Sequence, residues 1–314
     1  MKGIFANRSA LFQTGILFIM MLAGFIFSIC MISVVSLVVG LVSGKLAVEP
    51  MQQSVWFLQC TQFISAIFLF LFPALATAWL CSEQPKEFLC LRAFPDIRLL
   101  SFICLTTLLL SPTVSVTSYF NEQIQLPDSM AAIEEWMKSA EELAYSLVQK
   151  MISEKGVAPF ILNLLVIAVA AGLTEEFLFR GALLRIVQQK IQNHHVAIWL
   201  VAIIFSAIHF QFYGFIPRLI LGAYLGYLVY WTQNIWVPVF AHFLHNAVAF
   251  IGMSNDSLKD MALFSDDIAP EDVRWLTIAA GICLIVFIYC IWRIRKKPPL
   301  TPPKGEDCAR ASKE

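Results

Sequence analysis

Two adjacent glutamates, Glu175 and Glu176, lie in an otherwise apolar stretch that continues to Arg180. Neighbouring residues of a helix point about 100° apart, so the two carboxylates would face different partners. Glu176 and Arg180 are four residues apart, which is the spacing of an ion pair within one helix. We therefore predict that Arg180 holds Glu176, while Glu175 stays available as a general base for a water molecule. The alternative is a structural polar cluster that joins helices.

Two later apolar stretches carry histidines. A lone histidine such as His209 is more often a hydrogen-bonded structural residue than a catalyst. His242 and Asn246 are four residues apart, so they would lie one turn apart on one face of a helix. A buried asparagine needs partners for its donors and its acceptor, so it rarely lies idle in lipid. With the glutamates, these side chains indicate one concentrated polar site built from three nearby helices.

The surroundings of these residues are strongly apolar. Hydrophobic residues make up 59% of the 314 positions and charged residues only 14%, whereas about 25% of the residues in soluble domains are charged. A soluble fold of this length could not bury so much apolar side chain, so lipid must be the solvent. We predict an all-α, polytopic transmembrane helical bundle. It would be an integral, multi-pass protein of the cell (inner) membrane if the source is a bacterium.

Apolar runs of sufficient length predict about eight transmembrane spans. Their approximate limits are 10–43, 54–80, 97–118, 159–183, 196–213, 217–233, 236–253 and 274–292. In this division Glu175 lies near the inner end of the fourth span, and His209 lies inside the fifth. The candidate site would then be built at the inner or middle depth of the bilayer.

The distribution of charge predicts that both termini are cytoplasmic. The segments 1–9, 81–98, 180–195 and 293–314 hold 15 of the 22 Lys and Arg residues. Cytoplasmic loops of membrane proteins are enriched in these two residues, so we assign the four segments to the cytoplasmic side. Eight spans also return the chain to the side on which it began, in agreement with the charge distribution.

The spans and the polar segments divide the chain into five parts. They are three N-terminal transmembrane helices (1–120), an amphipathic segment (121–157), a transmembrane core with the candidate site (158–255), an outer loop with the last transmembrane helix (256–296) and a disordered cytoplasmic tail (297–314). The amphipathic segment is expected on the outer membrane surface, and packing against the bundle is the alternative.

Three motifs follow one another on successive predicted helices: Glu175-Glu176-x-x-x-Arg180, Phe205-x-x-x-His209 and His242-x-x-x-Asn246. In this order they resemble the motifs of the CPBP family. That family includes the type II CAAX prenyl endopeptidases and bacterial proteins linked to bacteriocin processing and self-immunity. The resemblance covers about residues 155–255. Gly222 and Gly226 also fit it, although their spacing alone indicates helix packing.

The resemblance implies an all-helical intramembrane endopeptidase whose motif residues line a cavity open toward the cytoplasm. Glu175 and His209 would activate a water molecule for attack on a peptide carbonyl. His242 and Asn246 would stabilise the oxyanion, a role worth a few kcal/mol for each donor. The expected partners are the lipid bilayer and a peptide or protein substrate, either prenylated or a leader peptide, and not nucleic acid.

The resemblance leaves the cofactor open. If zinc is bound, Glu175, His209 and His242 would supply three ligands and leave a fourth position open. The sequence lacks the His-Glu-x-x-His helix that places two zinc ligands on one face. Glu176, already held by Arg180, would also not easily orient a ligating imidazole. A water molecule held without a metal is therefore the favoured interpretation.

Two other classes of function remain as alternatives. A non-catalytic immunity factor or scaffold could have the same fold, but it would not need all six polar site residues. A secondary transporter could use buried glutamates and histidines as a proton relay. It would be expected to place polar residues in symmetry-related halves, whereas the polar residues of this chain cluster in one half.

Overall fold

The computed structural model describes residues 2–43, 54–255, 257–258, 261, 263 and 270–294, and every regular element in this part of the chain is helical. Seven helices in the described part are long and apolar enough to cross a membrane. The protein is therefore a polytopic helical bundle and an integral, multi-pass membrane protein, as predicted. The expected tail, 297–314, lies outside the described residues.

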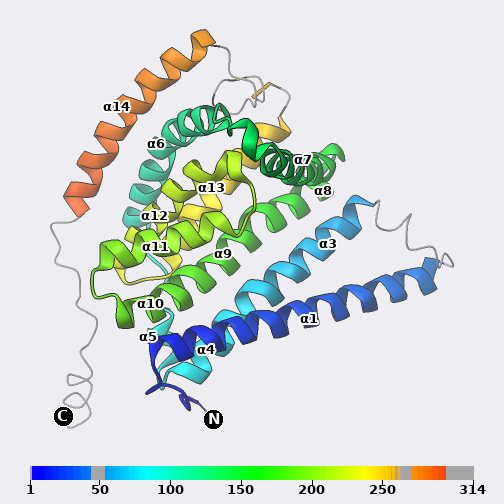
Figure 1. The fold of residues 1–314 in the computed structure, drawn as a ribbon, viewed down its shortest axis with the longest axis vertical. Helices are drawn as coiled ribbons and strands as arrows, with labels where there is room; N and C mark the ends of the chain where they lie inside the picture. Colours follow the sequence, from blue (N-terminus) through cyan, green and yellow to red (C-terminus); the bar gives the residue numbers. More distant parts are fainter. Residues whose placement is uncertain are drawn as a thin grey trace.

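The elements follow the chain in a single series (Figure 1). They are α1 (Ala10–Ser43), α3 (Val55–Ala66), η1 (Ile67–Leu71), α4 (Phe72–Cys81), α5 (Pro85–Phe88), α6 (Ile97–Glu122), η2 (Asp128–Met130), α7 (Ala131–Ser153), α8 (Val157–Asn163), η3 (Leu164–Ala170), α9 (Ala171–Glu176), η4 (Phe177–Leu183), α10 (Leu184–Lys190), α11 (His194–Ala207), η5 (Phe212–Gly214), α12 (Phe215–Thr232), α13 (Trp236–Ser254) and α14 (Pro270–Ile294). Of the short elements, η1, η3 and η4 are π-helical, whereas η2 and η5 are 3₁₀-helical.

The fourth predicted span is longer than expected. Elements α8 to α10 form one continuous helical segment of 34 residues, Val157–Lys190. The helix is longer than the apolar run because polar and basic residues such as Arg185 end the run without ending the helix. Glu175 lies near the middle of this helical segment, which at about 51 Å is longer than the hydrocarbon core is thick, so its depth in the bilayer stays a prediction. The π-helical stretches η3 and η4 flank α9, and π-helical turns frequently mark functional sites.

The fifth predicted span, 196–213, is wrong as a helix boundary. Helix α11 has only 14 residues and ends at Ala207, so it is about 21 Å long at 1.5 Å per residue. The hydrocarbon core is about 30 Å thick, and α11 is accordingly the one shorter apolar helix of the described part. Aromatic residues after Ala207 prolonged the apolar run, but Phe210 adopts a left-handed conformation (φ 53°) and the chain turns there.

Glycines allow the helices of the core to approach one another closely. A Cβ atom at Gly172 would lie 2.9 Å from the backbone nitrogen of Phe243, so α9 and α13 cross nearly in backbone contact. A Cβ atom at Gly226 would lie 2.7 Å from Ile198, and one at Gly222 would lie 3.1 Å from the Phe205 ring. The interpretation of Gly222 and Gly226 as helix-packing positions is confirmed.

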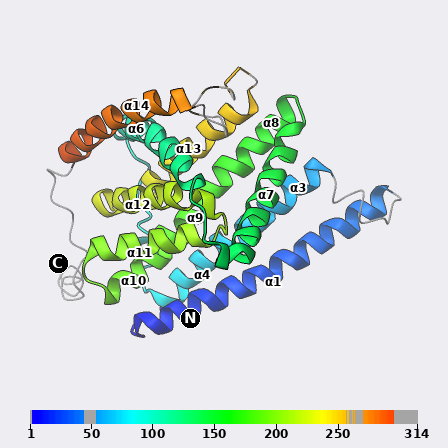
Figure 2. The same cartoon turned by 45° about the horizontal axis from the view of Figure 1, so that its top comes forward.

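Helix α7 is amphipathic and lies at the end of the bundle away from α5 and α10 (Figure 1). Figure 2 shows it beside α8 and α3. It leaves large apolar side chains such as Trp136 and Leu143 exposed, and only Met151 is buried. The Met151 carbonyl accepts a 2.7 Å hydrogen bond from Asn163, whose side-chain oxygen accepts one of 2.8 Å from Gln59. The C-terminal end of α7 is thus fastened to α8 and α3.

The charge distribution predicts which of these two ends faces the cytoplasm. In a variant without its native cysteines, a membrane-impermeant thiol reagent should label Ser139→Cys on α7 in intact cells. It should label Lys86→Cys on α5 only after the membrane has been opened. Both positions are exposed, so burial does not limit labelling. Labelling of Lys86→Cys but not of Ser139→Cys in intact cells would reverse the predicted orientation.

Candidate active site

Glu176 and Arg180 form the predicted ion pair in the interior of the bundle. Arg180 Nη1 donates to Glu176 Oε1 at 2.6 Å, and the two side chains are 1% and 0% exposed. Arg180 Nη2 donates to the carbonyl of Gly222 at 2.8 Å, and the guanidinium carbon lies 4.7 Å from the centre of the Phe205 ring. Residues of α11 and α12 thereby help to stabilise a charge carried by η4.

His242 binds the same carboxylate oxygen. Its Nδ1 lies 2.8 Å from Glu176 Oε1. Glu176 is ionised in its pair with Arg180 and can only accept hydrogen bonds, so Nδ1 carries a proton. Glu176 therefore orients the His242 imidazole while it is held by Arg180, and the expectation that it would not easily do so is wrong. One carboxylate oxygen accepts both hydrogen bonds, an arrangement that the spacing of residues along one helix does not reveal.

Glu175 faces the other side of the same imidazole. Its Oε2 atom lies 4.0 Å from His242 Nε2, and 15% of its side chain is exposed. This distance exceeds a direct hydrogen bond, but a water molecule about 2.8 Å from each atom would fit between them. The four residues Glu175, Glu176, Arg180 and His242 thus form one continuous polar cluster, which begins with a buried cation and ends with a partly accessible carboxylate.

His209 reaches this region from a turn and not from a helix. Its Nδ1 lies 2.8 Å from the carbonyl of Phe205. A carbonyl only accepts, so Nδ1 carries the proton and Nε2 is left as an acceptor. The Phe205 ring contacts both imidazoles, with its centre 5.1 Å from that of His209 and 5.9 Å from that of His242. His209 is therefore held beside the polar cluster through Phe205.

Asn246 lies one turn beyond His242 on α13. Its side-chain nitrogen donates to the carbonyl of Ile167 in η3 at 3.1 Å. The altered hydrogen-bond register of a π-helix explains why a carbonyl in the middle of a long helix accepts from another helix. Asn246 and Ile167 line a cavity of about 610 Å³, which is bordered on its other side by residues of α7 such as Glu141 and Val148.

The position of this cavity separates two expectations. The family resemblance implies a cavity open toward the cytoplasm, whereas the charge distribution places α7 outside. Residues of α7 line this cavity, so an opening past α7 would lead to the outside in the predicted orientation and to the cytoplasm in the reverse one. The labelling of Ser139→Cys described above distinguishes them.

The site does not fit the three-ligand zinc centre that Glu175, His209 and His242 would form if a metal were bound. Ligand atoms about 2.0–2.1 Å from a tetrahedral zinc ion are roughly 3.4 Å apart, whereas Glu175 Oε2 and His242 Nε2 are 4.0 Å apart. Within the described residues, no three His, Cys, Asp or Glu side chains are grouped closely enough to hold a metal ion. We therefore derive no chemical step through a metal.

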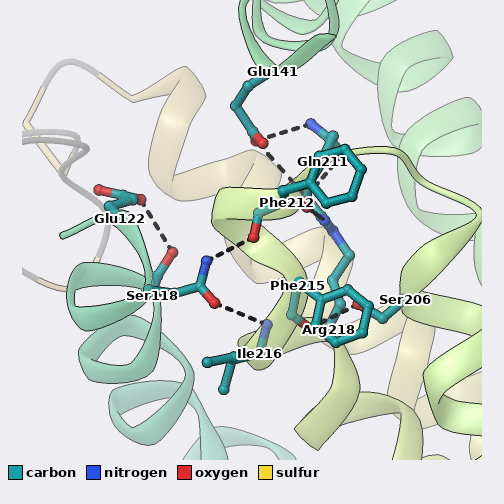
Figure 3. A network of polar contacts seen from close by, with 10 residues as sticks. Ser118, Glu122, Glu141, Ser206, Gln211, Phe212, Phe215, Ile216 and Arg218 are labelled. Atoms are coloured by element: carbon teal, nitrogen blue, oxygen red, sulfur yellow. Dashed lines mark hydrogen bonds and ion pairs between the residues drawn. The ribbon is translucent and has the colours of Figure 1, made fainter. Parts of the chain in front are cut away.

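Arg218 is a residue of this region that we did not single out from the sequence. It lies near the start of α12 and donates to the backbone and side-chain oxygens of Gln211, at 2.7 and 2.8 Å (Figure 3). A signal was present, because Arg218 falls inside the predicted span 217–233 and a charged residue within a span marks a functional site by default. No sequence signal identified the π-helical stretches.

Comparison with known proteins agrees with the resemblance. Residues 157–248, which include all six candidate site residues, match the family model described as type II CAAX prenyl endopeptidase Rce1-like. The chain is 34% identical over 104 residues to the uncharacterized protein YpbD of Bacillus subtilis (strain 168), a match that covers 32% of this chain and 48% of that relative. The chain thus spans about half the length of YpbD. No solved structure matches this chain.

The Arg180–Glu176 pair should contribute strongly to stability. Replacing Arg180 by methionine leaves the buried Glu176 carboxylate without a charged partner, so we expect the free energy of unfolding to fall by about 3–5 kcal/mol. Adding Glu176→Gln should recover part of this loss. Thermal unfolding in detergent measures both effects, and Lys190→Met, an exposed change in the same helical segment, is the control. Equal unfolding temperatures for Arg180→Met and Lys190→Met would contradict this account.

Proposed function

We propose that this protein is an intramembrane endopeptidase that hydrolyses a peptide bond in a membrane-associated chain, such as a prenylated or leader peptide. The observation that carries the proposal is the polar cluster that leads from the Arg180–Glu176 pair through His242 toward Glu175. It lies in the part of the chain that matches the endopeptidase family model. A hydrolase needs such a cluster because water must be activated within an apolar interior.

Glu175 is the proposed general base. It is the one carboxylate of the adjacent pair that Arg180 does not hold, and part of its side chain is accessible. It accepts a proton from water as the oxygen attacks the peptide carbonyl carbon. His209 orients this water through its unprotonated Nε2, because Nδ1 is engaged by the Phe205 carbonyl. Glu175 then passes the proton to the leaving amine as the carbon–nitrogen bond breaks.

His242 and Asn246 are the proposed oxyanion donors. The Glu176 carboxylate holds the Nδ1 side of the His242 imidazole, and Nε2 is the proposed donor to the oxyanion when it carries a proton. Asn246 uses one of its two amide hydrogens for the Ile167 carbonyl and keeps the other for the substrate. Donors that are held in place by their neighbours need no reorganisation when negative charge develops on the carbonyl oxygen.

A non-catalytic scaffold or immunity protein is the competing proposal. Such a protein could use the Glu176–Arg180 pair and His242 to join helices. It has no corresponding use for Glu175, for which the 4.0 Å approach to His242 is the only ion-pair contact in the described structure. Substitution of Glu175 therefore separates the two proposals better than substitution of Glu176.

Glu175→Gln should abolish proteolysis and leave the fold intact, because the change is nearly isosteric and removes only the base. We expect the rate of cleavage to fall by about 10²–10⁴-fold. Comparison of peptide termini in cells with the wild type and with this variant identifies the substrates, and purified protein then gives the rate. Glu87→Gln, an exposed change on α5, is the matched control. Activity within twofold of wild type would eliminate Glu175 as the base.

The proposed reaction uses no metal ion. Purified, active protein should therefore contain less than stoichiometric zinc, and a chelator should leave its cleavage rate unchanged. Metal analysis of the purified protein, together with rates before and after chelation, tests this expectation. Stoichiometric zinc whose removal stops cleavage, and whose return restores it, would overturn the metal-free mechanism.

A further inference from the structure

The turn that carries His209 is held by side chains from other elements (Figure 3). We define residues 208–214, between α11 and α12, as the His209 loop. Asn121 of α6 is 3% exposed. It donates to the carbonyl of Phe212 at 2.7 Å and accepts from the backbone nitrogen of Ile216 at 3.3 Å. The side chain of Ser206 donates to the Phe215 carbonyl at 2.7 Å. These contacts hold the end of the loop and the first turn of α12.

Arg218 holds the middle of the same loop. Its two terminal nitrogens donate to the backbone and side-chain oxygens of Gln211, two residues after His209. The guanidinium also covers Gly214, where a Cβ atom would lie 2.5 Å from Arg218 Nη2. The planar fork of an arginine suits this geometry, because two oxygens of one residue are bound in parallel.

Helix α7 contacts the loop at two separate points. Glu141 Oε1 lies 3.3 Å from Gln211 Nε2 and 4.0 Å from Arg218 Nη2. The Trp136 ring packs against the rings of Phe210 and Phe212, with centres 6.4 and 5.2 Å apart. Trp136 and Glu141 are five residues apart on α7, and about half of the residues of this helix are exposed. The position of the His209 loop therefore depends on its contacts with α7.

Glu141 and Arg218 are two partly buried charges that compensate each other. Burial raises the pKa of the Glu141 carboxyl, and the Arg218 charge opposes that rise. Glu141 Oε2 is itself buried and has no hydrogen-bond partner within the described structure. Loss of either charge therefore leaves the other in a partly desolvated setting, where an unpaired charge is unfavourable. The contact favours the conformation in which α7 lies against the loop.

We infer that Arg218, Gln211 and Glu141 form a positioning network for His209. The position of this catalytic histidine then depends on the packing of α7 against the His209 loop. The inference rests on the proposed function. Helix α7 also borders the cavity that reaches Asn246. A substrate that enters this cavity therefore contacts the same helix that fixes His209. These three residues act through His209 and are positioning residues, not catalytic ones.

The kinetic test compares single and paired substitutions. Arg218→Met and Glu141→Gln should lower kcat by about 10–100-fold, since displacement of a catalytic group by 1 Å can cost 10²-fold. KM should stay within about threefold in Arg218→Met, because Arg218, unlike Glu141, does not line the cavity at Asn246. Arg218→Lys keeps the charge but loses the fork, so its kcat should be intermediate. The exchanged pair Glu141→Arg with Arg218→Glu should recover part of the activity lost in Glu141→Arg alone.

Hydrogen exchange gives a readout that does not depend on activity. Amide exchange in residues 208–216 should become at least about tenfold faster in Arg218→Met and Glu141→Gln, because local opening determines exchange. Exchange within α13 should not change. Glu135→Gln, an exposed change on α7 outside the network, should alter neither exchange nor kcat.

The outcomes separate this inference from the proposed function. Faster loop exchange together with a lower kcat supports the network. Unchanged exchange in both variants overturns it, and so does faster exchange with kcat within twofold of wild type. If the wild type cleaves nothing, the proposed function fails. Faster loop exchange would then still support the coupling of α7 to the loop, whereas unchanged exchange would overturn that coupling as well.

Discussion

The structure depends on the compensation of two buried charges, those of Glu176 and Arg180, in a protein surrounded by lipid. An ionised group without partners in a low-dielectric interior costs several kcal/mol, and a single ion pair does not satisfy every donor and acceptor. Arg180 therefore also binds the Gly222 carbonyl and lies against Phe205, while Glu176 also binds His242. Because these partners come from α12, α11 and α13, the need to stabilise two charges gathers the helices of the core around η4.

Such compensation requires helices that lie unusually close together. Gly172 lets α9 cross α13 almost in backbone contact, and this crossing brings His242 within hydrogen-bond reach of Glu176. Nearby, π-helical η3 presents the Ile167 carbonyl to Asn246. Small residues are favoured at helix interfaces in membranes because packing, and not the hydrophobic effect, drives association there. The hydrogen bonds between the polar side chains of this core therefore depend on the close packing of its helices.

The candidate site combines two kinds of support. Its glutamates, Arg180, His242 and Asn246 stand on long helices, whose backbone hydrogen bonds and neighbours keep them in place. His209 stands on a turn after α11, and polar side chains from α6, α12 and α7 hold that turn and the start of α12. A group on a loop is positioned less rigidly than one on a helix unless such contacts fix it. Arg218 and Glu141 supply such contacts to Gln211, two residues after His209.

The sequence by itself determined the helical class, the membrane environment and the Glu176–Arg180 pair. These features depend on composition and on contacts within one helix, which residue spacing reports directly. The tertiary structure alone decided that α11 ends before His209, since the aromatic residues that follow are apolar in composition but lie in a turn. It also decided that one oxygen of Glu176 binds both Arg180 and His242, and that residues of α7 line the cavity at Asn246. These last contacts join residues far apart in the chain, so they depend on helix crossings and π-helical turns that local spacing does not encode.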